Sequence, residues 1–144
     1  MTSFPAVARD AGSADFFDAA ARGELLVQRC RACGTVLPPE ARTCPSCGSG
    51  ELGATGVSGL GRLVTWAVVT QAPIPVLAGA VPYVTAVVEL DEGPWLIVRL
   101  IDADTRSAEL SVGNRVRVDF VRSGAGQNTG EVLPVFRPVP EESA

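Results

Sequence analysis

All four cysteines of the chain fall within residues 30–48, as two Cys-x-x-Cys pairs that ten residues separate. A glycine follows each pair, and glycine can adopt the positive φ that turns backbone N–H groups toward the thiolates. A tetrahedral zinc ion needs four soft ligands at about 2.3 Å, and two such turns facing each other across a short hairpin supply them. The pattern therefore predicts one metal site with the ligands Cys30, Cys33, Cys44 and Cys47.

Other roles for these thiols fit the sequence less well. Disulfides need an oxidising compartment, and the N-terminus lacks the basic and apolar pattern of a secretory leader, so we expect a cytoplasmic protein. A thioredoxin-type pair needs a βαβ setting, which is absent. Four thiolates fill the coordination shell, which favours a structural over a catalytic zinc, although iron stays open on ligand identity alone. Such a metal would fold a segment too short to form its own core.

The segment before the cysteines predicts a tail and one short helix. Residues 1–12 show no periodicity and are expected to be flexible. Ser13 is the expected N-cap of a helix that Gly23 ends. Phe16 and Phe17 lie about 100° apart on this helix, so each ring can face the core of the protein or a partner.

Glycine content divides the chain after the cysteines. Six glycines between residues 48 and 61 predict a flexible joint over residues 53–61, between a helix and zinc-ribbon module (13–52) and a second module (62–140). Residues 141–144 are expected to be an acidic tail. The second module alternates apolar and polar residues with period two. Five strands are expected, at Arg62–Gln71, Tyr83–Leu90, Trp95–Asp102, Arg115–Arg122 and Val132–Pro138.

Five short antiparallel strands in about eighty residues are typical of a small closed barrel of the OB type. Asp91–Pro94 predicts the turn of a hairpin. The expected fold is therefore mainly β, with a short N-terminal helix, a rubredoxin-like zinc ribbon and a five-stranded OB-fold barrel. The long connection Gln71–Pro82 is almost wholly apolar, which predicts either a partner surface or a plug for one barrel end.

Composition limits the chemistry of the chain. It has no histidine and no lysine, so the usual general base near neutral pH and the usual amine nucleophile are missing. Asp102, Asp104 and Glu109 are the remaining acid–base candidates, in an expected loop. The net charge of −4 argues against a binder of phosphate backbones, although zinc ribbons and OB folds are both common in such proteins. No apolar run reaches the roughly 18 residues of a membrane span, so no membrane association is expected.

The order of landmarks resembles one family. "FF" in a short helix, "LLVQRCRACG", "PP", "CPSCGS", a glycine-rich joint, "PYVTAVVELDEGP" and "LPVFRP" follow one another from about residue 13 to residue 140. This is similar to the acyl-CoA-associated family in which a rubredoxin-like zinc ribbon precedes an OB fold, a domain of unknown function. The four cysteines match the metal ligands of that family one for one.

The resemblance implies an accessory subunit and not an enzyme in its own right. Members associate with thiolase-fold proteins: acetoacetyl-CoA thiolase with hydroxymethylglutaryl-CoA synthase, acyltransferases, and retro-aldolases of steroid side-chain breakdown. It implies no catalytic residue in this chain, because the chemistry of the family resides in the partner. We therefore expect a heteromeric complex of lipid or steroid metabolism that holds an acyl-CoA, with single-stranded nucleic-acid binding as the alternative.

Contacts to the partner or the acyl-CoA can be assigned to particular residues only as expectations. Charged contacts to CoA phosphates have to come from arginine, because the chain has no other basic side chain. The candidates on or beside strands are Arg62, Arg99, Arg122 and Arg137. The predicted contact residues are Phe16, Phe17, Arg62, Trp66, Pro73, Ile74, Pro75 and Tyr83.

Overall fold

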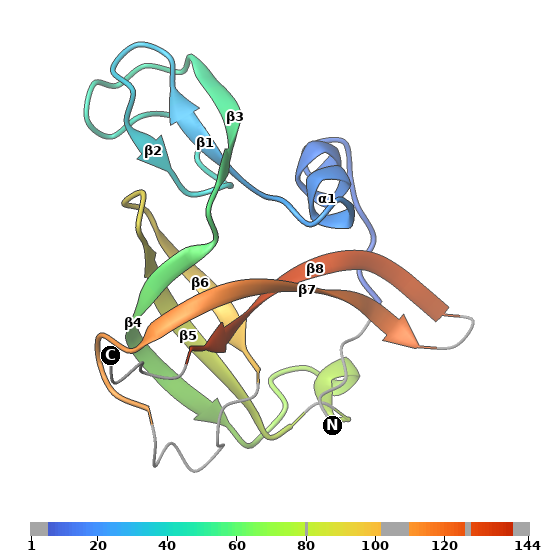
Figure 1. The fold of residues 1–144 in the computed structure, drawn as a ribbon. Coiled ribbons are helices and arrows are strands. Elements are labelled where there is room, and N and C mark those ends of the chain that lie inside the picture. Colours follow the sequence, from blue (N-terminus) through green and yellow to red (C-terminus); the bar gives the residue numbers. More distant parts are fainter. Residues whose placement is uncertain (1–5, 80, 102–109, 126–127, 140–144) are drawn as a thin grey trace.

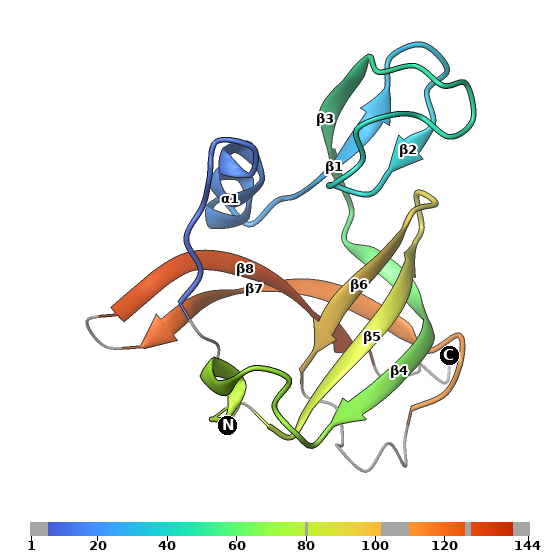
Figure 2. The same cartoon turned by 180° about the vertical axis from the view of Figure 1, so that it is seen from behind.

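The computed structural model describes residues 6–79, 81–101, 110–125 and 128–139, and its fold is mainly β, as predicted (Figure 1). Strands β1 to β3 form a small sheet that carries the cysteines, and β4 to β8 close into a barrel below it (Figure 2). The elements are α1 (Ala14–Ala21), β1 (Leu25–Cys30), β2 (Val36–Leu37), β3 (Leu52–Val57), β4 (Leu60–Val69), the 3-10 helix η1 (Pro75–Leu77), β5 (Tyr83–Leu90), β6 (Trp95–Leu100), β7 (Arg115–Ala125) and β8 (Asn128–Pro138).

The barrel has the strand order β4-β5-β6-β8-β7 and closes where β7 pairs with β4. All neighbours are antiparallel except β6 and β8, which are parallel and pair at Leu100 and Phe136. This is the arrangement of an OB fold, in which five strands build a Greek-key barrel. The predicted hairpin is present, because the Leu90 N–H donates to the Pro94 carbonyl at 2.9 Å across the turn between β5 and β6.

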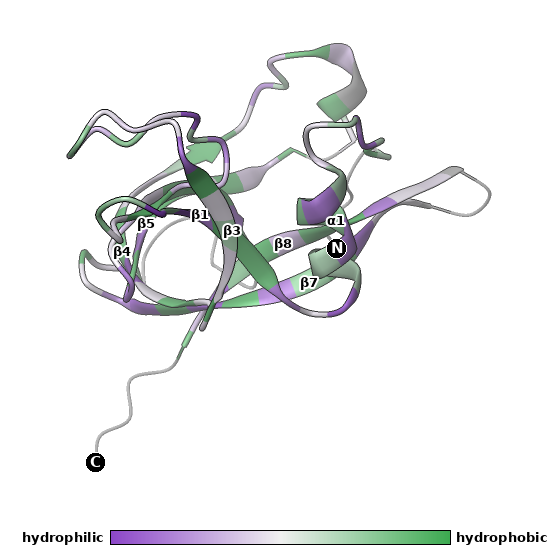
Figure 3. Cartoon of the chain, turned by 90° about the horizontal axis from the view of Figure 1, so that it is seen from above, coloured by the Kyte–Doolittle hydropathy of each residue, from purple (hydrophilic) through white to green (hydrophobic). Residues whose placement is uncertain are grey.

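The cysteine-bearing sheet shares its core with the barrel. Leu25 and Val27 alternate along β1 and point toward the barrel, where they are buried in one cluster with Leu63, Val88 and Phe136. In the view from above, β1 and β3 cross over the barrel strands (Figure 3). The two segments therefore pack against each other across a shared core.

The expected joint, residues 53–61, differs accordingly. Strand β3 occupies most of it and pairs with β1 from Leu25 to Cys30, so that only Ser58 and Gly59 connect β3 to β4. The glycine at position 53 serves packing, because a Cβ there would lie 2.7 Å from Nε of Arg31, whose guanidinium crosses β3 at this point. Glycine content was thus a poor guide to flexibility here, because cross-strand pairing orders the backbone.

Helix α1 begins and ends where the sequence predicts. Ser13 occupies the N-cap position but makes no capping bond, since its hydroxyl is engaged with Asp10, and Gly23 has the positive φ of 80° that ends the turn. The helix packs against β8 and β1. Phe17 is buried, and Phe16 is half-buried with its ring edge-on to Phe17 at 5.4 Å. Among the described residues, no helix is long and apolar enough to cross a membrane.

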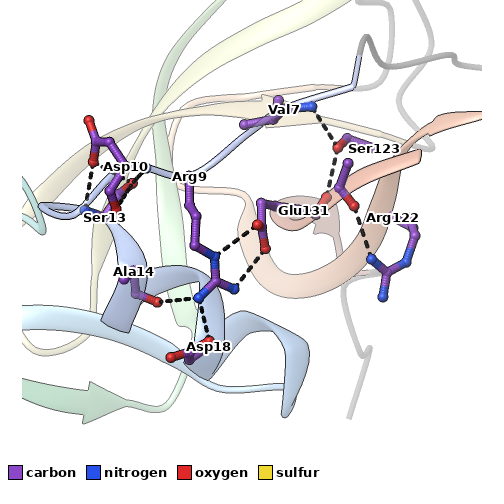
Figure 4. Close-up of polar contacts among 10 residues, drawn as sticks. Val7, Arg9, Asp10, Ser13, Ala14, Asp18, Arg122, Ser123 and Glu131 are labelled. Atoms are coloured by element: carbon purple, nitrogen blue, oxygen red, sulfur yellow. Dashed lines mark hydrogen bonds and ion pairs between the residues drawn. The ribbon is translucent and has the colours of Figure 1, made fainter. Parts of the chain in front are cut away.

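The described part of the expected flexible tail, residues 6–12, is attached to the β7–β8 hairpin, which extends beyond the barrel beneath α1 (Figure 1). The Val7 N–H donates to the buried Ser123 hydroxyl at 3.0 Å, and the Val7 carbonyl accepts from the Glu131 N–H at 2.7 Å. Arg9 donates to Glu131 at 2.8 Å and to Asp18 of α1 at 2.6 Å (Figure 4).

Strand β7 extends beyond its predicted end at Arg122, and strand β8 begins before its predicted start at Val132. The two strands continue to pair in these segments, although the sequence there shows no clear alternation of apolar and polar residues. The acidic tail, residues 141–144, lies outside the described residues.

Candidate metal centre and binding groove

The four cysteines converge at the end of the small sheet. Their sulfur atoms all lie within 4.8 Å of one another, with Sγ–Sγ distances of 3.6 Å between Cys30 and Cys47 and 3.5 Å between Cys33 and Cys44. A tetrahedron with metal–sulfur bonds of 2.3 Å has edges of about 3.8 Å, so the thiols fit a four-thiolate metal site. Cys30 and Cys44 are buried and their two partners are exposed, and all four are free thiols.

Two equivalent turns build this site. The Gly34 N–H donates to the Cys30 carbonyl at 2.8 Å, and the Gly48 N–H donates to the Cys44 carbonyl at 2.7 Å. Both glycines have positive φ, 83° and 78°, which an L side chain rarely adopts. Hydrogen bonds from the Thr35 hydroxyl and N–H lower the pKa of Cys33 to about 6, whereas a hydrogen bond from the Ser49 backbone is outweighed at Cys47 by its contact with Cys30 and by burial, which raise the pKa of Cys47 to about 12. The cysteines are thus positioned to bind a metal.

A groove of about 900 Å³ lies between α1, β1, the loop at residues 39–42 and the outer face of β5 and β6. A volume of this size is within the range of ligand-binding pockets, which are mainly apolar with a few polar groups. Its apolar lining residues are Phe16, Leu25, Pro39, Ala41, Tyr83, Trp95, Leu96, Ile97, Val98, Pro134 and Phe136. Its charged lining residues are Asp10, Glu40, Arg42 and Arg99.

The outer edge of β6 borders this groove and is largely unpaired. In the described chain, β6 pairs with β8 only at Leu100, so Trp95 to Val98 have a strand neighbour on one side only. The Leu90 N–H donates to the Pro94 carbonyl, so these two residues form a hydrogen-bonded pair of the β5–β6 ladder. Because such pairs alternate with non-hydrogen-bonded ones, the backbone N–H and C=O groups of Trp95 and Ile97 point away from β5. The Trp95 side chain is 57% exposed and that of Ile97 is 83% exposed. An apolar, unpaired edge of this kind is suited to pairing with another chain.

At the other end of the β6 outer face, Arg99 stacks on Tyr83. The guanidinium carbon lies 4.3 Å from the centre of the ring, within the range of a cation–π contact. Arg99 is half-buried, and this burial lowers the pKa of its guanidinium. A fixed, partly desolvated positive charge therefore lines the groove.

The structure brings together only some of the residues singled out from the sequence. Phe16 and Tyr83 line the groove, whereas Phe17 is buried and Trp66 packs against the barrel core. Arg62 is exposed on β4 and donates to the Gly113 carbonyl at 3.3 Å. Pro73, Ile74 and Pro75 are exposed on the connection between β4 and β5 and do not line the groove, so Ile74 does not plug the barrel.

The remaining candidates are dispersed. Arg122 lies on the extended hairpin and donates to the Gly130 carbonyl at 2.9 Å, while Arg137 pairs with Asp119 at 2.7 Å. Asp102, Asp104 and Glu109 lie outside the described residues. The sequence reasoning missed Trp95 and Ile97 as site residues, although their alternation in "WLIVRL" already placed both on one face of the strand.

The small sheet with its four converging thiols has the arrangement of a zinc ribbon, and the closed five-stranded barrel has that of an OB fold. The protein therefore belongs to the class in which a zinc ribbon packs on an OB fold. Residues 17–53 match the family model of the ChsH2 rubredoxin-like zinc ribbon domain, and residues 55–121 match that of the ChsH2 C-terminal OB-fold domain. The chain belongs to this family, also called DUF35, which confirms the resemblance inferred from the sequence.

Relatives carry names that describe assembly. A "DUF35 domain-containing scaffold protein" of Methanocaldococcus jannaschii is 31% identical over 83% of each chain. A "Probable enoyl-CoA hydratase alpha subunit" of Thermomonospora curvata is 36% identical over 97% of this chain, which spans only 41% of that relative. The solved structure "Ltp2-ChsH2(DUF35) aldolase" superposes with a TM-score of 0.70 at 36% identity, covering 93% of this chain and 98% of the matched one. A Sulfolobus solfataricus DUF35 protein of unknown function, at 13% identity and a TM-score of 0.53 over 75% of this chain and 77% of its own, shows the fold alone.

Proposed function

We propose that this chain is a non-catalytic accessory subunit. It binds a thiolase-fold partner and helps to hold an acyl-CoA while the partner makes or cleaves a carbon–carbon bond, in a reaction of the thiolase, acyltransferase or steroid side-chain retro-aldolase type. The observation that carries the proposal is the groove beside the unpaired edge of β6, because it joins a ligand-sized concavity to a surface suited to another chain.

The absence of catalytic function in the isolated chain is supported by its composition and its thiols. The sequence has no histidine and no lysine, and four thiolates around one ion leave no coordination position for water or substrate. We propose zinc as the ion, in a structural role, and a reducing cytoplasm as the location, because free thiols persist there. Relatives named scaffold proteins, and a solved complex named an aldolase, are consistent with chemistry in a partner.

Contact with the partner is proposed along Trp95 and Ile97, where exposed apolar side chains and free backbone groups coincide. A sheet edge of this kind gains main-chain hydrogen bonds and apolar contacts when a second chain covers it. The exposed Pro73–Pro75 stretch is proposed as a second contact. The solved relative, a complex of a ChsH2-type chain with Ltp2, is an example of such an assembly.

The groove also lies on the two barrel strands that OB folds often use to bind oligonucleotides. Its charged lining is two arginines and two acidic residues, which does not provide the excess positive charge that a phosphate backbone requires. An acyl-CoA fits better, because its acyl chain and pantetheine arm suit an apolar groove. Nucleic-acid binding is therefore not our proposal.

The test is co-purification and turnover. The chain is expressed with a thiolase-fold protein of its own organism, and acyl-CoA conversion is measured for each subunit alone and for the pair. We expect a stable complex, activity of the pair above that of the partner alone, and none from this chain alone. Ile97→Asp should abolish the complex, whereas Val112→Asp, a matched change at a site 75% exposed outside the groove, should leave it intact. Turnover by the isolated chain, or equal effects of the two variants, would contradict the proposal.

A further inference from the structure

We propose that Arg99, stacked on Tyr83, binds a phosphate group of CoA and so fixes the direction of the bound thioester in the groove. This inference rests on the proposed function, since it assigns one residue to the ligand proposed there. It is carried by the position of Arg99 in the groove, its contact with Tyr83 and the charges around it.

The position of Arg99 defines one end of the site. Arg99 and Trp95 are four residues apart on the same face of β6, which corresponds to about 13 Å at 3.3 Å per residue. Ile97 lies between them on the same face and also lines the groove, and the unpaired edge begins at the Trp95 end. A ligand with a charged head at Arg99 would therefore extend its apolar part toward the surface proposed to face the partner.

The chemistry of the guanidinium suits a phosphate. Arginine presents a planar set of N–H donors that matches phosphate oxygens, and a charge partly removed from water interacts more strongly with an anion. The Tyr83 ring contacts one face of the guanidinium and restricts the Arg99 side chain before any ligand binds. Arg99 therefore loses less conformational entropy when it binds a phosphate. CoA carries phosphates at one end and the thioester at the other, so its polarity matches that of the groove.

The neighbouring charges leave Arg99 as the best-placed cation. Asp10, which also lines the groove, accepts hydrogen bonds from the Ser13 N–H at 2.9 Å and the Ser13 hydroxyl at 2.8 Å. Glu40 and Arg42 both lie on the loop that forms the ribbon side of the groove, so together they add no net charge to it. Arg62, Arg122 and Arg137, which the sequence also suggested, do not line the groove.

The experiment uses the complex of this chain with its thiolase-fold partner and two probes, acetyl-CoA and S-acetylpantetheine, which lacks the phosphates. Arg99→Met should weaken acetyl-CoA binding about ten- to a hundred-fold, the range for loss of a charged hydrogen bond, and leave S-acetylpantetheine binding unchanged. Arg99→Lys should restore part of the affinity for acetyl-CoA. Arg117→Met, an exposed arginine on β7 outside the groove, is the matched control and should change neither.

The outcomes separate this inference from the function on which it rests. Equal weakening of both probes, unchanged binding of acetyl-CoA, or failure of the Arg99→Met chain to assemble with the partner would each overturn the phosphate assignment alone. Failure of the unmodified complex to bind or convert any acyl-CoA would overturn the proposed function and this inference with it.

Discussion

Replacement of Leu25 by alanine tests whether the cysteine-bearing sheet and the barrel are one unit. Leu25 is 2% exposed and packs in the barrel cluster although it belongs to β1. The change removes three carbon atoms, worth about 2.4 kcal/mol of transfer free energy at about 0.8 kcal/mol each. The framework of paired strands cannot close the cavity completely, so the expected loss is about 2–5 kcal/mol of the free energy of unfolding. For a small domain this is a large part of the total stability.

The assay follows urea unfolding of the metal-loaded protein with two probes. Fluorescence reports on the barrel, because both tryptophans, Trp66 and Trp95, lie in barrel strands, and a chromophoric chelator reports metal release from the cysteines. We expect the two probes to share one midpoint and Leu25→Ala to lower both together. Leu26→Ala, at a half-buried position on the opposite face of β1, should have a smaller effect. Two separate midpoints, or a change below about 0.5 kcal/mol for Leu25→Ala, would refute a shared core.

Two further predictions concern the metal and the N-terminal attachment. Cys47→Ser removes an exposed candidate metal ligand with little change in core volume. Elemental analysis should show loss of bound metal, and the urea midpoint of barrel unfolding should fall with it. Metal loss at an unchanged midpoint would contradict a coupling between metal binding and the stability of the barrel. The hydrogen bond from Arg9 lowers the pKa of the Glu131 carboxyl from its usual 4.5 in the folded protein. The ionised carboxylate therefore stabilises the attachment of the N-terminal segment above pH 4.5. This stabilisation is lost as the pH falls through the lower pKa of the folded protein. Protection of the Val7 amide from hydrogen exchange should therefore decrease as the pH is lowered from 4.5 through the lower pKa of the folded protein, whereas Glu131→Gln should show no such change. Equal profiles would refute the role of the carboxylate.

The features that sequence reasoning predicted well are local ones. The Cys-x-x-Cys-Gly pairs define their own turns, so the convergence of the thiols follows from spacing and glycine conformation. The barrel strands follow from alternation, and the hairpin at Asp91–Pro94 from turn residues next to each other in the chain. Each of these signals lies within a few residues, where propensity and period are informative.

The features that sequence reasoning missed depend on contacts between residues far apart in the chain. Strand β3 was read as a flexible joint because its glycines are unfavourable for a strand, but pairing with β1 and the need to admit the Arg31 side chain at Gly53 decide its structure. Residues 6–12 were read as a tail, because nothing local shows that Ser123 and Glu131 would bind Val7. The groove likewise could not be predicted, since its walls come from α1, β1, the loop at residues 39–42 and three barrel strands.

A metal bound by the four cysteines would help to shape the groove. Residues 34–43 lie between the second and third cysteine, and Pro39, Ala41 and Arg42 from this short segment line the groove. A metal that joins the two cysteine pairs fixes both ends of that segment, while Leu25 and Val27 fix β1 to the barrel. With a metal bound, the ribbon wall would therefore be held at two places, by metal ligation and by a shared core. A site whose walls are held in this way loses less conformational entropy on binding, which agrees with the proposed role of holding a partner and its substrate.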